Sequence, residues 1–223
     1  MLREIIAIWR HQEFMNKVVE EFGQMLQDDE YIFANAWGAI EGRLNIAKIK
    51  EDIRARDKSV NEREREIRRR LLEHLSLNPT QDVSGCLVMM SLVKDAERLG
   101  DYAKNIFDLS VVLKGGAKEM KYFQRLSNIR GRMEGHLKQL QEAFLEGKEG
   151  LAQKILDDYA PIKNDCSGVL DDLFEDELPT REAVATAMLS RFLKRINSHI
   201  CNIASGLIYP VDRIDFVRGG ILD

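Results

Sequence analysis

The chain has 223 residues, with 33 Lys and Arg against 37 Asp and Glu, so its formal net charge is −4. This acidic balance argues against nucleic acid as the main partner, because binding a phosphate backbone needs a basic surface. Hydrophobic residues make up 44% of the chain, and no apolar run reaches the eighteen or so residues of a membrane span, nor does the amphipathic start resemble a signal peptide. We therefore expect a folded cytoplasmic protein that inserts into no membrane.

The first predicted helix rests on apolar residues spaced three and four apart, which is the pattern of a helix that buries one face. This stripe runs from Leu2 through Trp9 to Leu26. We expect the helix to continue or restart over residues 31–40, with Gly42 marking its end.

Two further helices are predicted before the middle of the chain. The second runs from about Asn45 to Leu77, where Asn78-Pro79 stops it, because proline cannot continue the hydrogen-bond ladder of a helix. The third starts near Pro79 and reaches Leu113. It includes the apolar stretch 86–93 and should be the most buried helix of its bundle.

A glycine pair, Gly115-Gly116, divides the chain into two halves of similar plan. Three more helices are expected after it, over about 117–145, from the break at 147–150 to Phe174, and from Pro179 to about Tyr209. The predicted fold is therefore all-α, with two tandem three-helix bundles of pseudo-symmetric plan over residues 1–114 and 117–223 and six long helices in all.

An internal repeat supports the two-bundle prediction, since a duplicated bundle should repeat its motifs about one hundred residues apart. Pro79-Thr80 is matched by Pro179-Thr180. When residues 97–106 are aligned with 194–203, three positions are identical, namely Arg98 with Arg195, Asn105 with Asn202 and Ile106 with Ile203.

The three cysteines, Cys86, Cys166 and Cys201, lie far apart and form no CxxC pair. In a chain without a signal peptide, such a set is typical of reduced thiols packed as small hydrophobic residues. We expect no disulfide and no catalytic cysteine.

A pair of carboxylates on the third helix is the most informative feature of the sequence. Glu97 and Asp101 are four residues apart, so both project from one face of the helix and repel each other unless a cation lies between them. They could form half of a metal site that a neighbouring helix completes. Alternatively, Lys94, Arg98 and Lys104 nearby could supply the counter-charge.

Gly100 lies between the two carboxylates, inside the predicted helix. Glycine at such a position costs about 1 kcal/mol relative to alanine, so a close approach of another helix or of a ligand is expected there.

The segment 97–106 reads Glu-Arg-Leu-Gly-Asp-Tyr-Ala-Lys-Asn-Ile. It resembles the signature of the PhoU family, a run close to Glu-Arg-Ile-Gly-Asp-His-Ala-x-Asn-Ile that closes each three-helix bundle. Leu77-Asn78-Pro79 resembles the turn between the second and third helices of that family. With the two-bundle layout, the resemblance extends over nearly the whole chain.

The resemblance implies a metal site in the first bundle, because ExxxD or DxxxD pairs on the second and third helices of PhoU bundles bind clusters of metal ions. The matching residues here are Asp57, Asn61, Glu97 and Asp101. Asn61 stands where a second carboxylate is usual and brings no charge, although Glu64 could compensate. The metal would be Fe, Zn, Mn or Mg, since carboxylates accept each of them.

The second bundle departs from this pattern. Lys194 and Ser198 stand at the positions of the two carboxylates, and a lysine repels a metal ion. We therefore predict no metal cluster in the second bundle. His199 is interpreted as a partly buried polar residue rather than as a ligand.

The function that the resemblance implies is regulation rather than catalysis. A PhoU-like protein would modulate phosphate uptake and phosphate-responsive signalling through contact with the ATPase of a phosphate ABC transporter or with a membrane sensor kinase. A related alternative is a cytoplasmic regulator of a sodium-phosphate cotransporter. Another is a helical-bundle protein that binds or buffers metal.

Two expectations come from the residues themselves. The sequence contains no P-loop, Rossmann glycine pattern, HExxH or GxSxG motif, so we do not expect an enzyme. If an apolar stripe on the long helices stays exposed in the monomer, a second copy of the chain would cover it, so we expect a homodimer.

Overall fold

The computed structural model describes residues 2–114 and 116–214. Over this part of the chain it contains seven α-helices, two short 3-10 helices and no strand. The α-helices are α1 (Leu2–Trp9), α2 (Glu13–Ile40), α3 (Ile46–Leu77), α4 (Val83–Leu113), α5 (Phe123–Glu146), α6 (Glu149–Glu175) and α7 (Thr180–Ile208), and the 3-10 helices are η1 (Ala117–Glu119) and η2 (Val211–Arg213).

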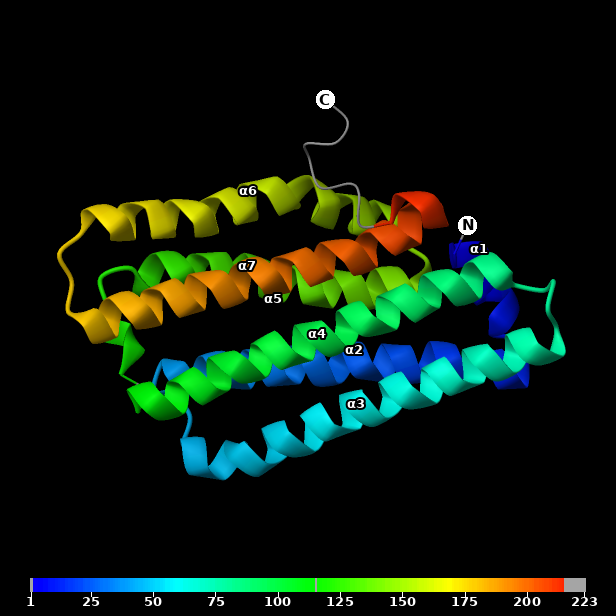
Figure 1. Cartoon of the computed structure of the whole chain (residues 1–223), viewed down its shortest axis with the longest axis horizontal. Helices are drawn as coiled ribbons and strands as arrows, with labels where there is room; N and C mark the ends of the chain where they lie inside the picture. Colours follow the sequence, from blue (N-terminus) through cyan, green and yellow to red (C-terminus); the bar gives the residue numbers. More distant parts are fainter. Residues whose placement is uncertain (1, 115, 215–223) are drawn as a thin grey trace.

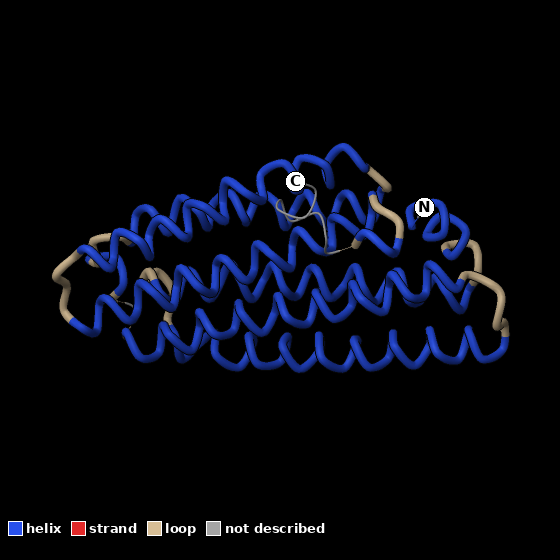
Figure 2. The backbone as a smooth tube through the Cα atoms, turned by 45° about the horizontal axis from the view of Figure 1, so that its top comes forward, coloured by secondary structure: helices blue, strands red, loops and turns tan. Residues whose placement is uncertain are grey.

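The six long helices form two three-helix bundles that lie side by side along the length of the molecule (Figure 1). Helices α2, α3 and α4 pack together, and α5, α6 and α7 form the second bundle. The bundles meet chiefly through α4 and α7, with α2 also contacting α5, while α3 and α6 lie on the outside (Figures 1 and 2). The predicted all-α fold with tandem bundles is confirmed.

The distribution of apolar residues explains which helices are central. Helix α4 buries residues on several sides because it contacts α2, α3 and α7. Helix α3 buries only a narrow stripe, with Ile53, Val60, Ile67 and Leu71 inside and charged residues over most of the rest. No helix in the described ranges is both long enough and apolar enough to cross a membrane.

The first helix differs from the prediction because it is divided in two. α1 ends at Trp9 and α2 begins at Glu13, after which α2 is continuous to Ile40. The break lets α1 bury Trp9 against the start of α4, where Gly85 leaves the space: a Cβ at Gly85 would lie 2.7 Å from Cγ2 of Ile5. Apolar spacing alone did not indicate this change of direction.

The other helix ends follow local chemistry. Asn45 caps α3 by accepting a hydrogen bond from the backbone of Lys48 at 3.2 Å, and Pro79 follows the end of that helix. The third predicted helix begins at Val83 instead of near Pro79, and the fourth begins at Phe123 after η1. The remaining predicted ends agree within a few residues.

The three cysteines are buried, as predicted, and none of them forms a disulfide. Burial raises the pKa of the Cys86 thiol to about 11, with Asp82 adding to the effect, and burial raises the pKa of Cys166 to about 12. Because the thiolate is the reactive form, both of these residues are unreactive at neutral pH.

Candidate functional site

The predicted carboxylates lie on the face that α4 presents to α3, and lysines of α4 bridge them. Lys104 Nζ lies 2.7 Å from Asp57 Oδ1 on α3 and 3.4 Å from Asp101 Oδ1 on its own helix. Burial lowers the pKa of Lys104, but the hydrogen bonds and attraction to Asp57 and Asp101 outweigh that effect and raise the pKa overall. The ammonium group is therefore charged at neutral pH.

A second lysine bridges the next pair of carboxylates along the two helices. Lys94 Nζ lies 2.8 Å from Glu97 Oε2 and 3.7 Å from Glu64 Oε1 on α3. Both glutamates are 8% exposed, so these charges are largely removed from water. Arg98 connects the two pairs, since its guanidinium lies 3.6 Å from Glu97 and 3.4 Å from Asp101. The result is one continuous network, which we call the carboxylate–lysine cluster.

One acidic residue of this region was missed in the sequence. Asp29 on α2 is fully buried, and neither of its carboxyl oxygens accepts a hydrogen bond from a described residue. Burial raises its pKa well above the usual value, and Asp28, Asp57, Glu97 and Asp101 raise it further. Asp29 is thus driven toward the neutral, protonated form.

Gly100 of α4 leaves the space that the Asp29 carboxyl group occupies. A Cβ at Gly100 would lie 2.5 Å from Asp29 Oδ1, so only glycine allows α4 to pass over this carboxyl group. The prediction that Gly100 marks a close approach of another helix is confirmed. In the sequence, only Gly100 indicated that another group would pack at this place. It did not indicate that the group would be Asp29 of α2.

The predicted metal ligands do not surround a single point. Asp57 and Asp101 share Lys104, whereas Glu97 shares Lys94 with Glu64. The amide of Asn61 donates to the backbone carbonyl of Asp57 at 2.8 Å. Among the described residues, no three His, Cys, Asp or Glu side chains are placed to hold a metal ion. A metal ion would fit only if a lysine moved away.

The arginine-rich part of α3 forms ion pairs. Arg63 contacts Glu21 at 2.8 Å and Asp28 at 3.2 Å, both on α2. Arg70 contacts Glu66 at 2.8 Å within α3. The two Arg63 pairs join α3 to α2, whereas the Arg70 pair lies within α3.

The second bundle carries a different arrangement at the equivalent place. Lys194 Nζ donates to the hydroxyl of Ser167 on α6 at 2.8 Å, and Ser198 donates to the backbone carbonyl of Lys194. Two acidic residues of α6, Asp158 and Asp165, face α5 instead, where both pair with Arg132. No described carboxylate of α6 pairs with α7 at this position.

His199 connects the two bundles. The residue is polar, as interpreted from the sequence, but it is buried and not only partly so, and its Nδ1 lies 2.7 Å from Asp95 Oδ1 on α4. Asn202 donates to the same oxygen at 2.7 Å. The ring of His199 also stacks on Tyr102, with centroids 5.7 Å apart. Helix α4 therefore has two polar features. The carboxylate–lysine cluster lies between α4 and α3, and the buried contact of Asp95 with His199 lies between α4 and α7.

His136 on α5 should make stability depend on pH. Burial lowers its pKa, which the attraction of Asp158 opposes and the repulsion of Arg132 supports. Because the folded state resists protonation, stability should be full above the ordinary pKa of about 6.5 and should fall as the pH drops through it. Urea unfolding at pH 7.5 and 5.5 should show a larger loss for the wild type than for His136→Gln. An equal loss in both proteins would contradict this assignment.

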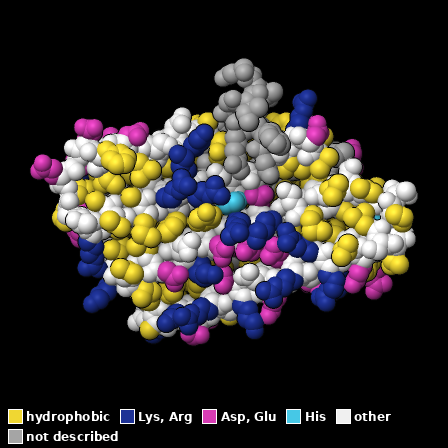
Figure 3. Space-filling view, viewed as in Figure 1, with side chains coloured by type: hydrophobic (Ala, Val, Ile, Leu, Met, Phe, Trp, Pro, Cys, Tyr) yellow, Lys and Arg dark blue, Asp and Glu magenta, His cyan; other side chains and the backbone are white. Residues whose placement is uncertain are grey.

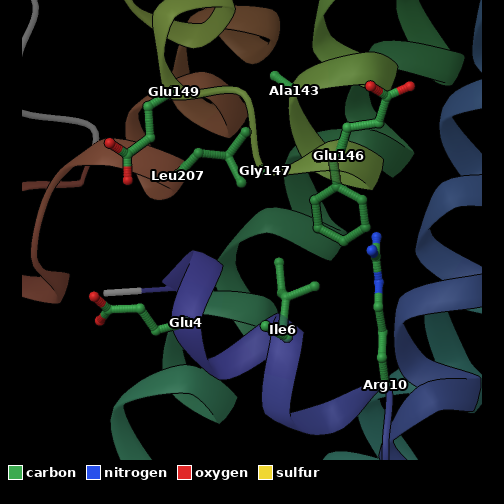
Figure 4. A pocket seen from close by; sticks show the side chains of 10 residues that line it. Glu4, Ile6, Arg10, Ala143, Glu146, Gly147, Glu149 and Leu207 are labelled. Atoms are coloured by element: carbon green, nitrogen blue, oxygen red, sulfur yellow. The ribbon is translucent and has the colours of Figure 1, made fainter.

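A pocket of about 410 Å³ lies at one end of the molecule, where α1 meets the turn between α5 and α6 (Figure 4). Ile6, Phe144 and Leu207 give it apolar walls. Arg10, which follows the end of α1, extends toward the end of α5, where it donates to the carbonyl of Leu145. The described residues that line it include no Ser, Thr, Cys, His or Lys.

These features define an all-α protein of two tandem three-helix bundles, with a carboxylate–lysine cluster on the first and a buried polar contact between them. The family model for the PhoU domain matches the chain twice, over residues 22–109 and 126–207. The chain belongs to the PhoU family.

Two solved structures share the fold. PhoU from Pseudomonas aeruginosa is 20% identical and superposes with a TM-score of 0.78, over 90% of this chain and 97% of that one. The phosphate transport system regulatory protein PhoU from Streptococcus pneumoniae is 19% identical, with a TM-score of 0.71 over 95% of this chain and 100% of that one. No curated protein sequence matches the chain.

Proposed function

We propose that this protein is a cytoplasmic regulator of phosphate uptake that works by contact with other proteins. The observation that carries the proposal is the double match to the PhoU domain, one match in each bundle. The similar Streptococcus pneumoniae protein is described as a phosphate transport system regulatory protein. The partner would be the ATPase of a phosphate ABC transporter, a membrane sensor kinase or, as an alternative, a sodium-phosphate cotransporter.

The chemistry of the surface supports contact rather than catalysis. In the carboxylate–lysine cluster, the carboxylates of Asp57, Glu64, Glu97 and Asp101 pair with Lys94, Arg98 and Lys104. Such a network can exchange its internal ion pairs for ion pairs with a partner, which gives specificity more than raw affinity. We assign the protein no catalytic role, no nucleic-acid partner and no insertion into the membrane.

The test is the rate of phosphate uptake in cells that lack the protein and are complemented with variants. Glu97→Lys with Asp101→Ser copies the second bundle into the first and should fail to restore regulated uptake. Glu51→Lys with Asp52→Ser changes the net charge equally at exposed positions of α3 and should restore it. If removing the protein leaves uptake and its response to phosphate unchanged, the proposal is wrong.

The second candidate function is metal binding. The cluster would bind a metal ion as part of regulation, or the protein would buffer metal as its main function. The buried Asp29 carboxyl favours it, because Asp28, Asp57, Glu97 and Asp101 raise its pKa and a cation would offset their repulsion. The bridging lysines argue against it, because they already supply the counter-charge.

Elemental analysis of protein purified without chelator tests the metal prediction. If a metal belongs to the cluster, the wild type should carry Fe, Zn, Mn or Mg, and Glu97→Ala with Asp101→Ala should lose it while remaining folded by circular dichroism. If the wild-type protein is metal-free and also takes up none of these ions in equilibrium dialysis, both the metal assignment and the metal-buffering alternative are wrong.

A further inference from the structure

The repeated third helix carries different charges in the two halves of the chain. In the alignment of the halves, four residues of α4 and their counterparts in α7 are Lys94, Glu97, Arg98 and Asp101 against Arg191, Lys194, Arg195 and Ser198. The four residues of α4 carry two positive and two negative charges. Those of α7 carry three positive charges and no negative charge. Helix α7 therefore has the cations of the repeat without its carboxylates.

Two of the cations of α7 have hydroxyl groups as partners. Lys194 Nζ donates to the hydroxyl of Ser167 at 2.8 Å, and Arg195 Nε donates to the hydroxyl of Tyr102 at 3.2 Å. Neither of them, nor Arg191, forms an ion pair with a carboxylate in the described part of the chain. A hydroxyl group accepts a hydrogen bond but brings no counter-charge, so the positive charges of α7 are not neutralised there.

Helix α6 adds a fourth cation beside them. Lys163 lies one turn before Ser167, whose hydroxyl donates to the backbone carbonyl of Lys163 at 3.0 Å. Residues four apart lie on the same side of a helix, so Lys163 is on the side of α6 that meets α7. Its Nζ lies 5.9 Å from the centre of the Tyr159 ring, and it pairs with no carboxylate that the structure describes. We call these four residues the basic patch, namely Lys163, Arg191, Lys194 and Arg195.

The basic patch is accessible and small. Arg191 is exposed and the other three residues are partly exposed, and Lys and Arg side chains gather over the middle of the second bundle in Figure 3. At about 1.5 Å per residue, the three cations of α7 span about 6 Å of helix, and packed helices such as α6 and α7 lie about 8–10 Å apart. The patch is therefore about 10 Å across, which is the length of about three extended residues.

The net charge of −4 limits what the basic patch can bind. A nucleic acid or an anionic bilayer presents negative charge over a much wider area than the patch, so it would also meet the acidic remainder of the molecule and be repelled. A short segment with several Asp or Glu residues meets the patch alone. Its size and charge therefore favour a short acidic segment over an extended polyanion.

We propose that the basic patch binds an acidic segment of a partner protein, about three or four residues long and rich in Asp and Glu. The carboxylates of the partner would supply to α7 the negative charge that Glu97 and Asp101 supply to α4 within the chain. Complementary charges of this kind select the partner and speed the encounter. This inference does not depend on the proposed role in phosphate uptake.

The experiment is fluorescence anisotropy with the full chain and a labelled peptide that carries Glu-Asp-Glu-Asp between Gly and Ser residues. The wild type should bind it at least about tenfold more tightly than the peptide with Gln-Asn-Gln-Asn, and added salt should weaken the binding. Arg191→Glu, at an exposed site that spares the fold, should weaken binding of the acidic peptide about tenfold. Lys48→Glu changes the net charge equally at an exposed position of α3 and should leave the binding unchanged.

Three results would overturn the proposal. The first is a wild type that binds the acidic and the neutral peptide equally. The second is an equal effect of Arg191→Glu and Lys48→Glu, since the peptide would then respond to net charge and not to the basic patch. The third is displacement of the acidic peptide by inorganic phosphate, or by vesicles of an anionic lipid, at an ionic strength at which chloride displaces none. The patch would then be a site for a phosphate group and not for a carboxylate segment.

Discussion

Replacing Gly100 by alanine is expected to destabilise the protein by about 2 kcal/mol, although alanine normally stabilises a helix by about 1 kcal/mol relative to glycine. The reason is the fully buried Asp29 carboxyl group, since the new Cβ would lie 2.5 Å from its Oδ1. Asp29 has a short side chain that is fully buried, so we expect α2 and α4 to move apart. The free energy of unfolding in urea gives the measurement.

The chain supplies matched controls for this substitution. Gly131 and Gly135 both lie within α5, and a Cβ at either position would meet nothing within 4 Å. Alanine there should stabilise by about 0.5–1 kcal/mol. Asp29→Ala should also remove most of the cost of Gly100→Ala, because the two changes act on one contact. If Gly100→Ala stabilises the protein as the α5 controls do, the close packing of α2 and α4 described above is wrong.

Replacing Asp95 by alanine is expected to cost about 3 kcal/mol of stability, because the carboxylate is buried between the two bundles. Its Oδ1 lies 2.7 Å from His199 Nδ1 and also accepts from Asn202 at 2.7 Å, so the change takes an acceptor from two buried groups of α7. Asp95→Asn keeps an oxygen at the site and should cost less.

Asp101→Ala on the same helix is the control for Asp95→Ala. Asp101 is partly exposed and lies about 3.4 Å from each of its partners, so its loss should cost 1 kcal/mol or less. Thermal and urea unfolding of the two variants compare them directly. Equal costs would show that the contact between Asp95 and α7 contributes no more than a surface ion pair.

The internal repeat shows why this contact occurs once. In the alignment of the two halves, His199 corresponds to Tyr102 and Asp95 corresponds to Phe192. The equivalent of the His199–Asp95 contact is therefore the contact between Tyr102 and Phe192, whose ring centroids lie 6.2 Å apart. One half of the interface between the bundles is polar and the other is aromatic. The two halves therefore share the same helix arrangement but use different side chains at this contact.

The sequence predicted the bundles well because their signals are local. The long α3 between Asn45 and Pro79, the repeated third helix and the break near Gly116 all follow from capping, proline and glycine positions. The division of the first helix into α1 and α2 was not predicted. It depends on α1 packing over Gly85, which is distant in the sequence.

The candidate site was only partly predicted, because it depends on the register between helices. The spacing of Glu97 and Asp101 placed them on one face, but no local pattern shows that Lys94 and Lys104 reach Glu64 and Asp57 across to α3. Asp29 was missed because an acidic run within an apolar stripe resembles a break in a helix. Only the packed structure reveals it as a buried group beneath α4.

The most direct test of the central claim is a pull-down from phosphate-replete cells with the wild type and the Glu97→Lys, Asp101→Ser variant. If the protein regulates phosphate uptake through the carboxylate–lysine cluster, mass spectrometry should find a phosphate transporter or its sensor kinase with the wild type and not with the variant. If neither protein retains any phosphate-related partner, the PhoU fold is present without the proposed function.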